Sequence, residues 1–130
     1  MATLTPTIKL ISAAGQATSD ALSVSLSKAL TVVAPSVGLS KITATTTATD
    51  SIILPSLDAR RYLFAHNTGV DSSGSDTTSE VYIESELGRI GKLDVDEFLF
   101  MPLDSNGVNK IQLKATTATI VVEYAYWTKG

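Results

Sequence analysis

The chain has 130 residues, no cysteine, one histidine and a formal net charge of −3. This length fits one domain with a sizeable core, and the lack of cysteine excludes disulfides, thiolate nucleophiles and cysteine-based zinc sites. The weak negative charge offers no basic field to nucleic acid or to an anionic membrane, and no apolar run approaches the ~20 residues of a membrane-spanning helix.

Apolar and polar residues alternate along most of the chain, which predicts strands rather than helices. Residues 1–20 are weakly tied to any core and are expected to form an N-terminal arm, and residues 21–130 are expected to form the folded domain. Within 20–33, "DALSVSLSKALTVV" places its Leu and Val residues on one side and its Ser residues on the other, as in a half-buried strand or two strands bent near Lys28.

Later segments repeat this pattern: "SKITATTTATDSIILP" (40–55), "RRYLFAHN" (60–67), "SEVYIES" (79–85), "DEFLFMPL" (96–103), "NKIQLKA" (109–115) and "TATIVVEYAYW" (117–127). About eight or nine short strands at this spacing predict an all-β fold, a single antiparallel β-sandwich or jelly roll with little or no helix. The polar stretches 66–80 and "DSNG" (104–107) are expected to be a long loop and a turn.

Aromatic residues are predicted to supply much of the core. Six of the eight form i, i+2 pairs, and each pair points to one side of a strand: Tyr62 with Phe64, Phe98 with Phe100, and Tyr124 with Tyr126. The segment 120–127 is apolar on both sides, because Val121, Ala125 and Trp127 alternate with the inward residues. A strand of this kind is expected between two others, inside a sheet.

The stretch 42–49 is β-prone and uncharged, with no Lys, Pro or Gly to guard it as a sheet edge. It must be covered by a neighbouring strand or by another chain. If another chain covers it, the expected interface residues are Ile42, Thr43, Thr45 and Thr47.

Signals for chemistry are weak. His66 shares its side of the strand with Tyr62 and Phe64, and it is expected to have a packing or capping role, since no G-x-S-x-G motif accompanies it. Two groups could offer oxygen ligands to calcium, but neither follows an EF-hand pattern: Asp94, Asp96 and Glu97, and Asp71, Ser73, Ser75 and Asp76. We therefore expect no catalytic residue, no metal and no cofactor, and place the doublet Arg60-Arg61 at a turn edge.

The segments "RRYLFAHNTG" (60–69), "VYIE" (81–84), "GRIGKLDVDEFLFMPLDSNG" (88–107) and "IQLKATTATIVVEYAYW" (111–127) resemble small structural proteins of tailed-bacteriophage virions. Similar chains carry an aromatic strand ending in Asn-Thr, then G-x-L-x-x-x-E-F-x-x-x-P-L, and close on V-E-Y-x-Y/F-W. The resemblance covers residues 60–127. Asp94-Val95-Asp96 stands where similar chains often have a Pro-Gly turn.

The resemblance implies a role in the virion and no active-site residues. The expected function is a capsid decoration or cement subunit on the head exterior, assembled in the host cytoplasm, with copies of itself and other virion proteins as partners. A tail or neck subunit is the alternative. A small glycan- or receptor-binding sandwich that uses the 66–80 loop is an alternative of another class, because sandwich folds host many functions.

Overall fold

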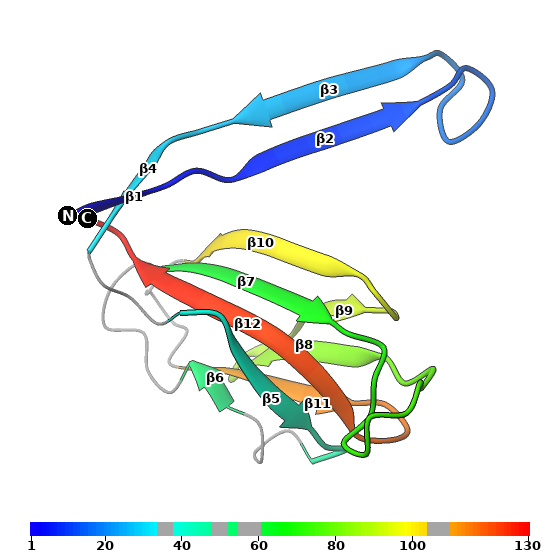
Figure 1. Cartoon of the computed structure of the whole chain (residues 1–130), viewed down its shortest axis with the longest axis vertical. Helices are drawn as coiled ribbons and strands as arrows, with labels where there is room; N and C mark the ends of the chain where they lie inside the picture. The colour runs from blue at the N-terminus through cyan, green and yellow to red at the C-terminus, as the bar shows by residue number, and fades with distance from the viewer. Residues whose placement is uncertain (34–37, 48–51, 55–60, 104–109) are drawn as a thin grey trace. The chain divides into compact units, whose positions relative to one another are not determined.

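A computed structural model describes residues 1–33, 38–47, 52–54, 61–103 and 110–130. Every regular element in these ranges is a strand: β1 (Ala2–Leu4), β2 (Thr7–Ser12), β3 (Leu22–Ser27), β4 (Leu30–Val32), β5 (Ser40–Ala44), β6 (Ile52–Leu54), β7 (Arg61–Asn67), β8 (Val81–Ser85), β9 (Gly88–Leu93), β10 (Phe98–Leu103), β11 (Ile111–Ala115) and β12 (Ile120–Thr128) (Figure 1). Among the described residues, no helix is long and apolar enough to cross a membrane. The all-β prediction is confirmed.

The chain divides into two compact units, Met1–Ala34 with Gly130, and Pro35–Lys129. In the first unit β1 pairs with β4 and β2 with β3, both antiparallel. The register runs without a shift from Ala2 opposite Val32 to Ser12 opposite Leu22. Pro6 has no N–H to donate but accepts from Lys28 N at 3.3 Å, so the two strand pairs form one long hairpin.

This hairpin extends beyond the predicted arm at 1–20 and takes residues from the predicted domain at 21–130. The physical reason is cross-strand pairing, since β3 and β4 bond to β2 and β1 rather than to the sheets of the second unit. The bend expected near Lys28 coincides with the gap between β3 and β4.

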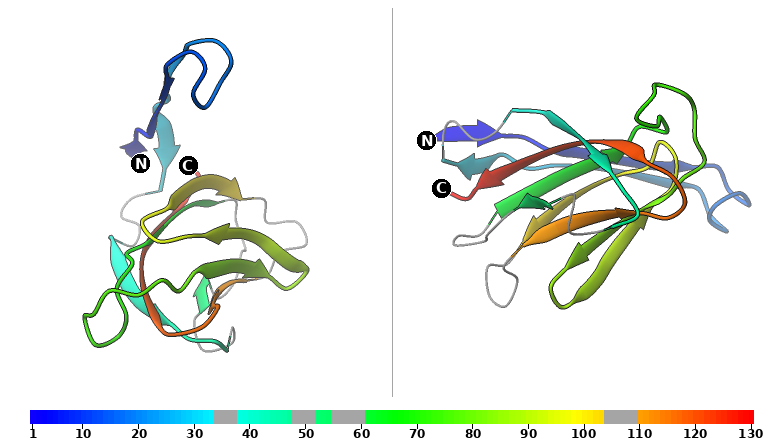
Figure 2. Two further views of the ribbon diagram at one scale, coloured as in Figure 1. Left: turned by 90° about the vertical axis from the view of Figure 1, so that its right-hand side faces the viewer. Right: turned by 90° about the horizontal axis from the view of Figure 1, so that it is seen from below.

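The second unit is a β-sandwich of two four-stranded sheets, visible as two layers in Figure 2. One sheet has the order β10-β7-β12-β5 and the other β6-β11-β8-β9. From β5 to β12, successive strands alternate between the sheets except at the β8–β9 pair, which is the connection pattern of a jelly roll. β12 lies between β7 and β5, as its two apolar sides predicted.

The core between the two sheets is aliphatic. Its largest fully buried apolar side chains come from both sheets: Leu63, Ile120 and Val122 from one, and Val81, Ile83, Ile111 and Leu113 from the other. Burying each such side chain contributes about 1.5–3 kcal/mol relative to leaving it in water, before the entropy cost of ordering it.

The six predicted core rings differ in burial and in the side of the sheet to which they point. Tyr62 is buried, Phe98 is 69% exposed, and the other four are half-buried: Phe64, Phe100, Tyr124 and Tyr126. Only Tyr124 and Tyr126 pack against the core cluster. The core side of β7 is filled by Leu63 and Ala65, and that of β10 by Leu99 and Met101. The rings of Tyr62, Phe64, Phe98 and Phe100 lie on the other side of these strands and point outward.

Three predicted features lie partly or wholly outside the described residues, namely the turn at 104–107, the doublet Arg60-Arg61 and the end of the stretch 42–49. Asp94-Val95-Asp96, which stands where similar chains often have a Pro-Gly turn, also forms a turn. In it Glu97 N donates to Asp94 O at 3.1 Å. Asp96 there has φ of 63°, a left-handed conformation that aspartate tolerates better than most residues.

Candidate interaction surfaces

The hairpin has one apolar face, formed by the even-numbered residues of β1 to β4. Residues directly opposite each other in an antiparallel pair point to the same side. The register therefore gathers one set on that side: Ala2, Leu4, Ile8, Leu10, Leu22, Val24, Leu26, Leu30 and Val32. Ile8, Leu10 and Leu26 are 48%, 53% and 65% exposed. The opposite face carries mostly Thr and Ser, with Lys9 and Ile11.

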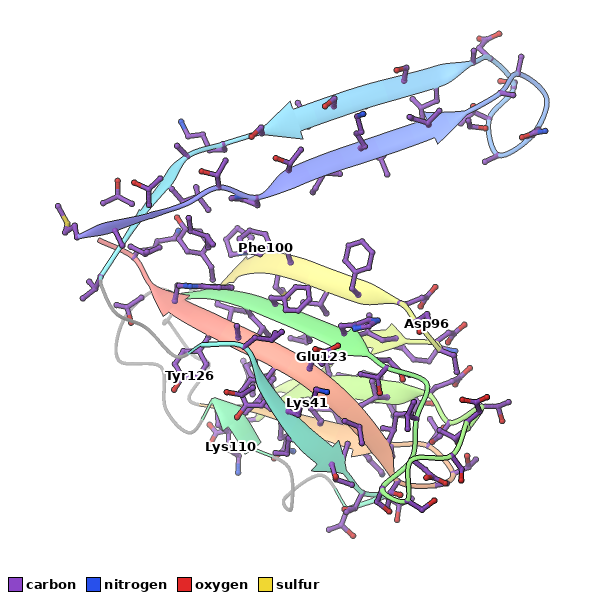
Figure 3. All side chains as sticks on the ribbon, viewed as in Figure 1. Lys41, Asp96, Phe100, Lys110, Glu123 and Tyr126 are labelled. Carbon is purple, nitrogen blue, oxygen red and sulfur yellow. The ribbon has the colours of Figure 1, made fainter. Side chains whose placement is uncertain are left out.

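The outer side of the sheet β10-β7-β12-β5 carries a band of rings that we call the aromatic face: Tyr62, Phe64, Phe98, Phe100 and Trp127. Phe100, labelled on β10 in Figure 3, is one of these rings. In the register Phe100 lies opposite Phe64, and Trp127 lies opposite Tyr62. The rings of Tyr62 and Phe100 stack with centroids 5.9 Å apart, and Phe100 and Trp127 are 6.4 Å apart. Lys129 Nζ lies 4.9 Å from the Tyr62 centroid, which helps to explain why this outward ring is buried.

His66 lies at one end of the aromatic face, beside Phe98 on β10 and Glu123 on β12. His66 Nδ1 is 3.1 Å from Glu123 Oε1, and Nε2 is 4.0 Å from Asp96 Oδ1. Both ring nitrogens therefore face carboxylates. In a Ser-His-Asp triad one nitrogen would instead face a hydroxyl, so this geometry is that of a polar cluster at the end of a strand.

The predicted interface edge begins on β5, the terminal strand of its sheet, which pairs with β12. Ile42 and Thr43 lie in β5, and Thr45 and Thr47 follow its end. Ile42 is half-buried against the core, while Thr43 and Thr47 are exposed. Thr45 O accepts from Ala115 N at 2.7 Å, so the end of β5 is tied to the other sheet. These four residues form an edge, and they lie apart from the aromatic side chains on β7 and β10.

The 66–80 loop is held by hydrogen bonds at both ends. Val121 N donates to Val70 O at 2.8 Å, and Thr77 N donates to Gly69 O at 2.9 Å. At its tip, Asp71 Oδ1 accepts from Ser73 N, Ser73 Oγ and Ser75 N at 2.8, 2.6 and 3.0 Å. The Ser73 hydroxyl, followed by the Ser75 and Ser73 amides, lowers the pKa of Asp71.

Several of the oxygens considered for calcium take part in contacts within the chain. Asp71 is bonded as above, and Glu97 Oε2 accepts from Asp94 N at 2.8 Å. Asp94 Oδ1 is 3.2 Å from Lys92 Nζ, which also bonds Glu80. Within the described ranges no group of three or more His, Cys, Asp or Glu side chains could hold a metal ion.

Removing the Ser73 hydroxyl should raise the pKa of Asp71 toward its ordinary value of 3.8, because that hydroxyl is the largest cause of the depression. Since the folded-state pKa is the lower one, the ionised loop contributes stability above the ordinary pKa and loses it as pH falls through the folded pKa. An NMR titration of the Asp71 carboxyl carbon should show the shift in Ser73→Ala. The control Ser72→Ala leaves these bonds intact, and an equal shift there would refute the assignment.

No protein-family model, curated protein or solved structure matches this chain. The surfaces above therefore rest on geometry alone. The sequence indicated the hairpin's apolar side through the alternation in 22–32 but assigned it to the sandwich. It missed the aromatic face because ring spacing shows which residues share a side of a strand, and not which side is covered.

Proposed function

We propose that this chain is a structural subunit of a tailed-bacteriophage virion, one that decorates the outside of the capsid. The observation that carries the proposal is the hairpin with its exposed apolar face. A two-stranded ribbon is marginal in water on its own, so a chain that presents one is suited to an assembly that covers it. The sequence resemblance over residues 60–127 supports the same class of protein.

The sandwich suits this role for a separate reason. The sandwich encloses an aliphatic core between two four-stranded sheets. Because the chain has no cysteine, this core and not a disulfide would have to keep the subunit folded outside the cell. Many weak contacts repeated over a shell add up by avidity, and each contact can remain small. The partners would be the major capsid protein and further copies of this chain, in particles assembled in the host cytoplasm. No step of this role needs a catalytic residue.

A glycan-binding module is the second candidate, and the aromatic face favours it. An exposed ring beside polar groups is a common way to stack a sugar, and Phe98 lies next to His66 and near Glu123. If the chain is a glycan-binding module, Phe98→Ala should abolish its retention on a glycan column, and the protein should be absent from virus particles.

Copy number in purified particles tests the proposal. Quantitative mass spectrometry should find hundreds of copies per particle if the chain decorates the capsid. A few to a few tens would assign it to the tail or neck, where the same surfaces would serve. Absence from particles would refute the virion role.

A further inference from the structure

Two apolar faces of this chain have no second layer within the unit that carries them. One is the apolar face of the hairpin, whose unit contains only the paired strands β1 to β4 among the described residues. The other is the aromatic face, which lies on the side of its sheet away from the core. Phe98 at 69% and Leu26 at 65% exposure are large apolar side chains of the kind that interfaces cover.

The two faces belong to units of opposite charge. Lys9, Lys28 and Asp20 give residues 1–34 a net charge of +1, and since the whole chain carries −3, the remainder carries −4. Two hairpins would repel each other weakly, and two sandwiches more strongly. A hairpin and a sandwich attract, so charge favours docking of one kind of unit on the other.

The area available favours two such contacts rather than one. The hairpin's face is 11 residues long, from Ala2 to Ser12, or ~36 Å at ~3.3 Å per residue, and two strands are ~10 Å wide. One docked hairpin would then bury ~700 Å² counted on both partners, below the ~1,200 Å² of a specific interface. Two reciprocal contacts would bury ~1,400 Å², within the usual range. The longest strand of the receiving sheet, β12, has 9 residues against 11 for the hairpin, so these areas are upper bounds and a single contact is smaller still.

We propose that the apolar face of the hairpin packs on the aromatic face of a second copy of this chain, and that two copies exchange hairpins reciprocally about a two-fold axis. Face-to-face packing of two sheets needs interdigitating apolar side chains on both surfaces. Ile8, Leu10 and Leu26 supply them from the hairpin, and Phe98 and Phe100 supply them from the sheet. This inference goes beyond the virion proposal and does not depend on it, because the purified chain alone is sufficient to test it.

Paired variants on the two faces of one strand test the hairpin's part. We expect the chain to sediment as a dimer at micromolar concentration, and Leu10→Asp to weaken the dimer at least ~100-fold, because the buried leucine is lost twice per two-fold dimer. Ile11→Asp is the matched control. Ile11 is the next residue and more exposed, at 73% against 53%, but it points to the other face and should leave the dimer unchanged.

A second pair tests the receiving sheet. Phe98→Asp should weaken the dimer as Leu10→Asp does. Leu87→Asp should not, because Leu87 is 79% exposed but lies in the turn between β8 and β9 of the other sheet. A dimer that resists Phe98→Asp would refute docking on the aromatic face.

Mixing the two disruptive variants keeps the test decisive even if Leu10→Asp loosens its own hairpin. The Leu10→Asp copy keeps an intact aromatic face, and the Phe98→Asp copy keeps an intact hairpin. Only the mixed pair contains one intact contact, about half of the wild-type interface, so labelled copies should associate more tightly when mixed than separately, but more weakly than the wild-type chain. A monomeric chain, an assembly larger than a dimer, or a mixture that associates no more tightly than the separate variants would each overturn the proposal.

Discussion

Replacing Leu63 with alanine should lower the free energy of unfolding by about 2–5 kcal/mol, whereas Phe98→Ala should change it by less than about 1 kcal/mol. Leu63 is fully buried in β7, with β10 on one side and β12 on the other. Its truncation leaves a cavity that two paired strands cannot close. Phe98 lies at the start of β10 and is 69% exposed, so its ring is already mostly in water in the folded state. Removing that ring therefore sacrifices little buried apolar surface.

Urea unfolding followed by Trp127 fluorescence measures both changes. Both variants should be made in the Leu10→Asp background, so that association does not contribute to the free energy. The comparison discriminates between an aliphatic and an aromatic core, because a core built on the rings would reverse the order of the two costs. A larger loss for Phe98→Ala than for Leu63→Ala would mean that the two sides of these strands are assigned the wrong way round.

The fold class follows from the sequence because period-two alternation is a local property of each strand. The central place of β12 also follows, since Val121, Ala125 and Trp127 make its second side apolar as well. Which side of β7 is buried does not follow. In "YLFA" both parities are apolar, and the neighbouring β10 repeats the ambiguity, with Leu99, Met101 and Leu103 on the core side and Phe98 and Phe100 on the other.

The hairpin shows the same limit at a larger scale. Alternation in 22–32 indicates a strand with one apolar side, but it cannot say whether the covering layer belongs to the same unit or to another molecule. The cluster at His66 could not be predicted from the sequence either. Glu123 is 57 residues away in sequence, and only the register between β7 and β12 brings the two side chains together.

Replacing Asn67 with alanine should cost about 3–5 kcal/mol of unfolding free energy, although Asn67 is polar and lies at the end of a strand. Its side chain is fully buried and makes three hydrogen bonds. Nδ2 donates to Ser79 O at 3.2 Å and to Leu93 O at 3.1 Å, and Oδ1 accepts from Gly69 N at 2.9 Å. Truncation leaves three buried backbone groups without this partner, and the lower part of the usual range of about 1–3 kcal/mol for each gives the total of about 3–5 kcal/mol.

Asn67→Asp tests whether the two donated bonds carry this effect, because it keeps the shape and removes both donors. The new carboxylate would face the carbonyl oxygens of Ser79 and Leu93, so burial and repulsion should raise its pKa above the unfolded value. With the folded-state pKa raised, the added destabilisation should be small in acid and grow as pH rises above the unfolded pKa. Urea unfolding at pH 3.5 and pH 7 measures the difference.

Thr68→Val is the matched control for Asn67→Ala, one residue further along the chain. Thr68 Oγ1 donates to Val121 O at 2.7 Å, but that carbonyl also accepts from Thr68 N at 3.2 Å, so it keeps a partner and the loss should stay below about 1 kcal/mol. The contrast isolates what Asn67 does. It joins the start of the 66–80 loop to Ser79 near the end of that loop and to Leu93 at the end of β9. Equal costs for the two variants would mean that the loop is held by its backbone bonds alone, and that a buried asparagine at this position is replaceable.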